Sequence, residues 1–246
     1  MEAEKSLEHL DNPRLSGLVH RTKGDIYGVE CLHKNALEEY QKSKEYFDKA
    51  ELPIHSAYAL YNIANTYSKL RDYDNAIKYL LKSEEQFSEN GYSLYQFDTQ
   101  IELCYNYIQI DDFNSCANVF ARIDKSANIG YSYCDYYCIY AILSAHSGNF
   151  DDAKTYISKA KTEQIIKPMQ LAYSEYIIMT ICGDDSDALT MYREMIAEQD
   201  KFVFNAINNS LLQSQVDLLS GQVASAKEIQ QKTRLINYLL AIISAS

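Results

Sequence analysis

Apolar residues recur every three or four positions through most of the chain, most clearly in residues 57–90. This spacing puts the apolar side chains on one face of a helix, so the pattern predicts successive amphipathic helices. Only 3 prolines and 8 glycines interrupt a chain of 246 residues, which also favours helices over strands and long loops. The predicted breaks between helices fall at Pro53, Gly91, Gly148, Pro168, Gly183 and Gly221.

A short motif repeats along this helical pattern. It consists of an aromatic or other apolar residue, two polar residues, and a small residue that opens an amphipathic helix, as in Tyr73–Ala76 and Phe150–Ala153. Successive copies are 40, 40, 37, 35 and 38 residues apart, which predicts a stack of similar helix pairs. A small side chain lets two helix backbones approach closely where they cross. The small residues are Ala36, Ala76, Cys116, Ala153, Ala188 and Ala226.

The copy from Ala57 to Asn90 resembles a tetratricopeptide repeat, a pair of antiparallel helices with a period of about 34 residues. Copies from Phe97 and Cys134 follow the same pattern, and weaker copies begin near Gly17, Met169 and Ile207. The matching residues of the clearest copy are Leu60, Ile63, Ala64, Tyr67, Tyr73, Ala76, Leu80 and Ser83. The resemblance implies an all-α fold, a right-handed α–α superhelix of about five to six helix-turn-helix repeats.

The 40-residue steps are longer than the family's period, so we expect second helices that are longer by about one turn, as in residues 37–52. Such lengthened repeats resemble those of bacterial regulatory and sensor proteins. No change of composition divides the chain. We therefore expect a capping helix at residues 1–16, a repeat solenoid at 17–206, and a degenerate last repeat with a C-terminal helix at 207–246.

Acidic residues gather where the second helices are predicted to begin. A carboxylate at this position accepts a hydrogen bond from a free backbone N–H and meets the positive end of the helix dipole. We therefore predict a capping role for these acids rather than a catalytic one. They are Asp72, Asp74, Asp111, Asp112, Asp151, Asp152, Asp184, Asp185 and Asp187.

The formal net charge of −11 disfavours nucleic acid as a partner, because an acidic surface repels phosphate backbones. The 6 cysteines contain no CxxC pair, and we expect free, buried thiols in a reducing compartment. Cys134, Cys138 and His146 share one helix face, but no further ligand is evident and their neighbours are apolar, so no metal site is predicted. The chain has neither a phosphate-binding glycine motif nor a nucleophile elbow, so we expect neither enzyme activity nor a cofactor.

The family resemblance also implies where a partner would bind. In tetratricopeptide-repeat proteins the first helices line a concave groove, and we expect about half of its residues to be accessible while the others contact the neighbouring repeat. The family positions that face the groove correspond here to Arg21, Tyr58, Tyr61, Asn62, Asn65, Lys69, Asp98, Ile101, Tyr105, Asp135, Cys138, Ile142 and Tyr173.

One subclass of the family holds the C-terminal carboxylate of a peptide in a clamp of basic and amide residues. The corresponding residues here are Arg21, Asp25, Asn62, Asp98 and Glu102, and the three acids would repel a carboxylate. We expect instead a protein or peptide segment with apolar and basic side chains. Asparagine can bond a peptide backbone in both directions, and tyrosine buries a large area at low entropic cost.

The leading hypothesis is a non-catalytic scaffold that serves as the sensor or interaction part of a bacterial signalling protein. The alternative is an extracytoplasmic input domain of a membrane-tethered regulator, in which residues 224–243 lead into the bilayer. The apolar run 235–243 is shorter than the roughly 20 residues that span a membrane, so a packed final helix and the start of a membrane helix both remain open. Lys232 and Arg234 before the run favour the cytoplasmic side. Oligomeric state stays undetermined.

Overall fold

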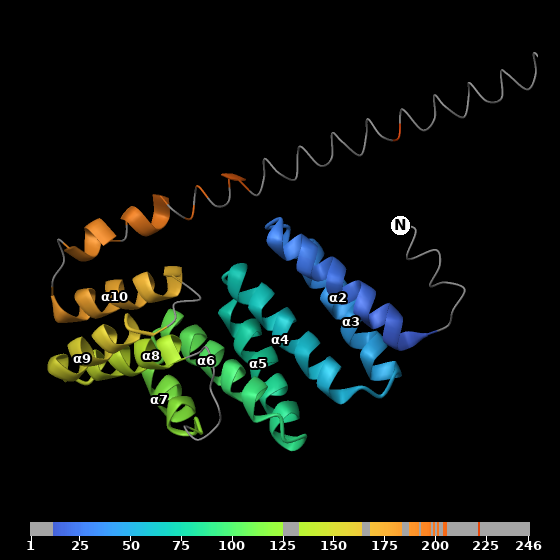
Figure 1. Cartoon of the computed structure of the whole chain (residues 1–246), viewed down its shortest axis with the longest axis horizontal. Helices are drawn as coiled ribbons and strands as arrows, with labels where there is room; N and C mark the ends of the chain where they lie inside the picture. Colours follow the sequence, from blue (N-terminus) through green and yellow to red (C-terminus); the bar gives the residue numbers. More distant parts are fainter. Residues whose placement is uncertain are drawn as a thin grey trace, which may run out of the picture. The chain divides into compact units, whose positions relative to one another are not determined.

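In the computed structural model, residues 12–124, 133–163 and 168–183 are described, together with scattered residues from 187 to 221. Residues 1–200 form one compact unit and residues 201–246 a second. In the first unit, successive helices from α2 to α7 pack against one another, and α8 packs against both α9 and α10 (Figure 1). They are α2 (Pro13–Val29), α3 (His33–Lys49), α4 (Pro53–Lys69), α5 (Tyr73–Glu89), α6 (Ser93–Gln109), α7 (Phe113–Ala121), α8 (Tyr133–His146), α9 (Phe150–Ala160) and α10 (Pro168–Cys182).

Helices α2 to α6 are all 17 residues long. A three-residue turn follows each of them, so a helix begins every 20 residues from Pro13 to Phe113. This regularity explains the 40-residue repeat seen in the sequence. The extra residues were predicted to lie in the second helices, but from α2 to α6 the first and second helices have the same length and share them. The second helix placed at residues 37–52 begins at His33 and ends at Lys49.

The turns between these helices have one common geometry. Cys31, Glu51, Arg71 and Asp111 adopt positive φ angles of 53–60°, and Gly91 takes the equivalent place at 73°. The backbone N–H of the residue after the positive-φ position closes the turn by donating to the carbonyl five residues earlier. An example is the bond from the Asp72 N–H to the Tyr67 carbonyl oxygen (3.0 Å). These are Schellman turns, which usually have glycine at the left-handed position. Here most of them use other residues, so the sequence lacks the glycine signal that marks helix ends.

Glu51→Gly is expected to raise the free energy of unfolding by about 0.5–1 kcal/mol. A left-handed conformation costs a side chain with Cβ about 1–2 kcal/mol, and the larger entropy of glycine in the unfolded chain offsets part of the gain. Glu51 is exposed, so little contact is lost. Urea unfolding followed by circular dichroism measures the change. Glu51→Ala, which removes the side chain but keeps Cβ, serves as the control, and a glycine variant no more stable than the alanine variant would contradict the argument.

Two of the predicted acidic caps are confirmed. The Asp72 carboxylate accepts from the Asn75 N–H (3.2 Å) at the start of α5, and Asp112 accepts from Ser115 (3.0 Å) at the start of α7. Asp111 instead occupies the left-handed turn position. Asp74, Asp151 and Asp152 lie in the first turns of α5 and α9. Asp184 and Asp185 lie outside the described residues.

The small residues of the repeat lie at helix crossings, as predicted. Ala36, Ala76, Cys116 and Ala153 are completely buried, and Ala188 is nearly so, whereas Ala226 lies outside the described residues. A serine seven residues further along the second helix ties the pair together. Ser43 donates to the Gly17 carbonyl (2.8 Å), and Ser83, 40 residues later, donates to the Ala57 carbonyl (2.9 Å).

The core runs continuously through the first unit. One apolar cluster joins residues of α4 to α10, with Leu103, Ile139 and Ile142 among its fully buried members. A smaller cluster around Ala36, Tyr40 and Ile63 joins α3 to α4. Consecutive helices packed in this way confirm the predicted fold class, an all-α TPR-like solenoid. The expected boundaries at residues 16/17 and 206/207 stay predictions.

Candidate functional site

A pocket of about 430 Å³ opens on the side of the first unit formed by first helices α2, α4 and α6. We call it the first-helix pocket. Helices α2 and α4 contribute side chains one turn apart, because residues three or four positions apart share a helix face, and α6 contributes one side chain. The lining residues are Arg21 and Asp25 of α2, Ile54, His55 and Tyr58 of α4, and Tyr95 of α6.

Tyr58 stands at the centre of the aromatic wall of this pocket. Its ring centroid is 5.9 Å from those of Tyr61 and Tyr95, and Tyr95 in turn stacks on buried Phe87 at 5.2 Å. The Arg21 guanidinium lies 6.0 Å from the Tyr58 centroid. Burial raises the pKa of the Tyr58 phenol above its ordinary value, so the ring stays neutral at physiological pH. The wall can therefore cover an apolar side chain of a ligand.

Asp25 is positioned by a tyrosine from the second helix of the same repeat. The buried Tyr40 hydroxyl donates to Asp25 Oδ1 (2.8 Å). Tyr40 reaches this carboxylate because Gly24 leaves room for its ring: a Cβ at Gly24 would lie 2.5 Å from Tyr40 Cε1. Burial and the bond to Asp25 raise the pKa of Tyr40. Asp25 thus presents a fixed negative charge one helical turn from the Arg21 cation, on the same wall of the pocket.

Several polar atoms in and beside the pocket are enclosed without a hydrogen-bond partner in the described part of the chain. They are Arg21 Nε, His55 Nδ1, Asn62 Nδ2 and Asn65 Oδ1. Asn62 and Asn65 follow Tyr58 along the same helix, α4. Burial, followed by the nearby charges of Arg14 and Arg21, lowers the pKa of His55. Enclosed groups without partners cost free energy, which a ligand that bonds to them recovers.

The residues predicted to face the groove divide into two sets. Those of α2 and α4, with Asp98 of α6 and Tyr173 of α10, are exposed or half-buried, and Arg21 and Tyr58 line the first-helix pocket. The accessible set is Arg21, Tyr58, Tyr61, Asn62, Asn65, Lys69, Asp98 and Tyr173. The partial exposure of these residues agrees with a position in the groove. Their role in binding stays a prediction.

The second set lies in the interior between α6, α8 and α10. Ile101, Tyr105, Cys138 and Ile142 are at most 5% exposed, and Asp135 is 8% exposed. The Tyr105 hydroxyl donates to Asp135 Oδ1 (3.4 Å), so these two buried polar side chains contact each other in the interior. These five side chains face no open surface in the structure, and a binding role for them remains untested.

Sequence reasoning missed Ile54, His55 and Tyr95 of the first-helix pocket. Tyr95 lies one turn before Asp98 on the same helix, so its place on the groove face was available from the helical spacing. His55 likewise lies one turn before the groove residue Tyr58. Both sit in the first turns of their helices, where the family pattern assigns no groove position in this chain.

The thiols and histidine considered for metal binding have other environments. Cys134 and Cys138 are buried against Leu171 and Ala160, and burial raises the pKa of both thiols. The His146 ring stacks on Phe113 at 4.0 Å instead of approaching the thiols. Within the described ranges, no group of three or more metal-ligating side chains comes together. Cys104 and Cys116 are also buried, whereas Cys182 is exposed, contrary to expectation.

The membrane-tether hypothesis concerns residues 224–243, which lie outside the described residues. Among the helices that the structure does describe, none combines the length and apolar character needed to cross a bilayer.

Solved proteins with a similar arrangement of helices are known. The tetratricopeptide-repeat profile matches residues 57–87, which make up most of α4 and most of α5. A crystal structure of NprR in complex with its cognate peptide NprX is similar at TM-score 0.59 and 17% identity, over 86% of this chain and 65% of that one. Aspartyl phosphate phosphatase F from Bacillus subtilis is similar at TM-score 0.62 and 15% identity, over 77% of this chain and 51% of that one.

BtubC from P. vanneervenii is similar over 84% of this chain and 87% of its own, at TM-score 0.54 and 17% identity. The chain therefore spans about two thirds of the NprR chain and half of the phosphatase chain. Among curated proteins, none matches the sequence significantly. At these identities the solved structures establish the fold. One tetratricopeptide repeat is recognised in the sequence, at residues 57–87, and the described helices share the fold of these solved structures.

Proposed function

We propose that this chain is a non-catalytic scaffold that binds a peptide segment of a partner along its first helices. The first-helix pocket carries the proposal, because it joins an aromatic wall, charges of opposite sign and polar atoms without partners. Its volume lies within the range of about 300–1,000 Å³ that is usual for ligand sites. A pocket of this size holds a few side chains, and α4 continues the binding surface beyond it.

The chemistry of the pocket favours apolar and basic side chains in the bound segment. Tyr58 and Tyr95 cover an apolar side chain, while Asp25 keeps an oxygen for a cation after accepting from Tyr40. Asn62 and Asn65 are half-buried side chains of α4, and each amide carries one donor group and one acceptor group for a ligand backbone. One face of α4 thus supplies both kinds of bond that an extended backbone requires.

A sensor role in bacterial signalling is part of the same proposal. It is supported by the fold shared with NprR, whose structure holds its cognate peptide, and with the B. subtilis phosphatase. The second of these is described as an enzyme, so shared fold alone does not separate scaffold from catalyst. The pairing of Tyr40 with Asp25 and of Arg21 with Tyr58 favours holding a ligand over activating a nucleophile.

The double variant Tyr61→Ala/Asn65→Ala is expected to weaken peptide binding at least about tenfold while leaving the melting temperature nearly unchanged. Binding is measured calorimetrically with peptides selected on the wild-type protein from a random octapeptide library. We expect the selected sequences to combine apolar residues with lysine or arginine.

Asn35→Ala/Asn114→Ala, at two exposed residues of the second helices α3 and α7, is the control and should bind as the wild type does. Selection of acidic peptides would overturn the assigned ligand chemistry. Unfolding of the Tyr61→Ala/Asn65→Ala variant would show that these side chains belong to the core instead of the binding surface.

A further inference from the structure

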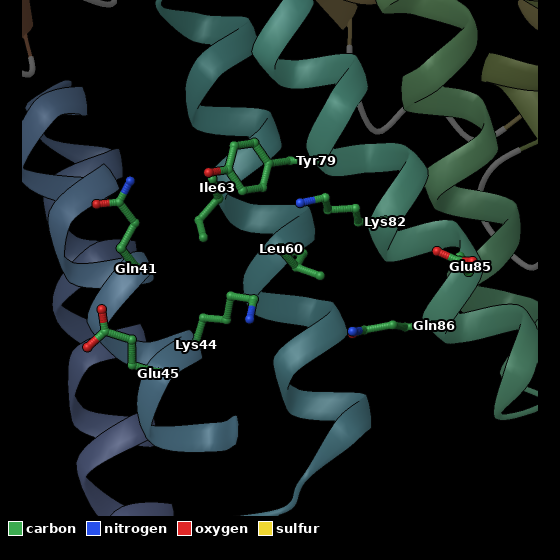
Figure 2. Close-up of a pocket in the computed structure, with 9 residues that line it drawn as sticks. All are labelled: Gln41, Lys44, Glu45, Leu60, Ile63, Tyr79, Lys82, Glu85 and Gln86. Carbon is green, nitrogen blue, oxygen red and sulfur yellow. The ribbon is translucent and has the colours of Figure 1, made fainter. Parts of the chain in front are cut away.

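A second pocket, of about 600 Å³, lies on the opposite set of helices (Figure 2). We call it the second-helix pocket. Its walls are the second helices α3 and α5, and its floor is the face of α4 between them. Leu60 and Ile63 form this floor, and only 1–2% of each residue is exposed. The residues around them are Gln41, Lys44 and Glu45 of α3, and Tyr79, Lys82, Glu85 and Gln86 of α5.

The charges in this pocket are arranged with the cations inside. Figure 2 shows the Lys44 and Lys82 side chains extending from opposite walls toward the floor at Leu60, whereas the carboxylates of Glu45 and Glu85 stand toward the outer edges. In a chain of net charge −11, a recess with two inward-pointing ammonium groups is a distinct local environment. Such a recess attracts an anion, and the surrounding acidic side chains lie at its rim.

The inward cations have weak partners. Lys44 pairs with Asp48 (2.6 Å), one helical turn further along α3, in an ion pair that is partly exposed on both sides. Lys82 lies 5.8 Å from the Tyr79 ring, and the described residues offer it no carboxylate within ion-pair distance. An exposed helix-surface pair contributes little stability, so a ligand carboxylate can replace Asp48 at small cost.

Gln86 adds an amide to the same wall. Among the described residues its Oε1 is enclosed without a hydrogen-bond partner, and its amide nitrogen points toward the centre of the pocket in Figure 2. The pocket therefore combines an apolar floor, two cations and one amide donor. Glutamine N–H and lysine ammonium groups both donate to carboxylate oxygens.

We propose that the second-helix pocket binds a carboxylate attached to an apolar body. The carboxylate lies between Lys44, Lys82 and Gln86. The apolar body lies against the half-buried Tyr79 ring and the aliphatic parts of the two lysines, above the closed floor of Leu60 and Ile63. This ligand preference is opposite to that of the first-helix pocket and does not depend on it. The carboxylate can belong to a free organic acid or to a glutamate side chain beside leucine in a partner protein.

Methyl NMR of the protein labelled at leucine and isoleucine tests the proposal, with Leu60 and Ile63 as reporters. Two probes separate the sources: octanoate for a free acid, and an acetylated, amidated Ala-Leu-Glu-Ala peptide for a protein side chain. We expect one or both to shift the two reporters in a saturable manner, whereas octylamine does not. Absence of a saturable shift with both probes would overturn the proposal.

The variant Lys44→Gln/Lys82→Gln is expected to weaken probe binding about tenfold, which corresponds to the loss of two partly exposed ion pairs. Lys49→Gln/Lys78→Gln removes two charges from the same helices outside the pocket and should bind as the wild type does. Equal binding by both variants would show an apolar surface without carboxylate recognition, and would also contradict the proposal. Neither result bears on peptide binding at the first-helix pocket.

Discussion

Phe47→Ala is expected to lower the free energy of unfolding by about 3–5 kcal/mol, the usual cost of removing a buried aromatic ring. Phe47 is completely buried near the end of α3. Its ring lies against α2, where a Cβ at Gly17 would come within 2.7 Å of it, and its centroid is 5.0 Å from the His55 ring of α4. One side chain thus joins three successive helices. Urea unfolding followed by far-UV circular dichroism measures the loss.

Gly17→Leu provides a sharper form of this test. Alone, the leucine side chain collides with the Phe47 ring and should destabilise the protein. In the double variant Gly17→Leu/Phe47→Ala, the leucine enters the space that the ring has left. We therefore expect the double variant to be at least about 1 kcal/mol more stable than the sum of the single changes predicts. Additive losses would show that the two residues do not share one space.

Phe204→Ala is the matched control for the loss of a ring. Phe204 is 64% exposed, so its removal should change the stability by less than about 0.5 kcal/mol.

Ala76→Leu is expected to destabilise the protein by about 1–3 kcal/mol through overpacking of a helix crossing. Ala76 has no exposed surface and lies in the first turn of α5, where this helix meets α4. The added carbons have no space there, so the two helices must move apart. Thermal and urea unfolding measure the effect.

Lys78→Leu adds a leucine at an exposed position of the same helix and should stay within about 0.5 kcal/mol of the wild type. If the two leucine variants were equally stable, Ala76 would not mark a crossing, and the alignment of the repeats would be wrong.

The helix pairing was predictable from sequence because tight crossings restrict side-chain size. Ala36, Ala76, Cys116 and Ala153 recur at nearly fixed steps, and all four are buried. Helix ends were less predictable. Four of the five turns between Val29 and Phe113 use a residue other than glycine in the left-handed conformation, so the common signal for a helix C-terminus is missing there.

The residues of the candidate site were likewise only partly predictable from the sequence. Arg21 and Tyr58 were predictable because the family positions hold in α2 and α4, but in α6, of the same length, Ile101 and Tyr105 are buried. Beyond α6 this regularity ends, since α7 has 9 residues and α8 has 14. Cys138 and Ile142, carried over by the same alignment, lie in the core that α8 shares with its neighbours. The residue types at these positions do not show which of them become enclosed, because enclosure depends on how α6, α8 and α10 pack together.

The identical helix and turn lengths from Pro13 to Asp112 have a consequence for how this protein can change. Leu32 and Asp72 occupy the same place at the ends of their turns, so removing residues 33–72 would join two equivalent junctions. Duplicating that segment would be equally compatible with the backbone. The N-terminal half can therefore grow or shrink by whole 40-residue modules without new loop sequences, and gene duplication alone could lengthen the surface it offers to partners.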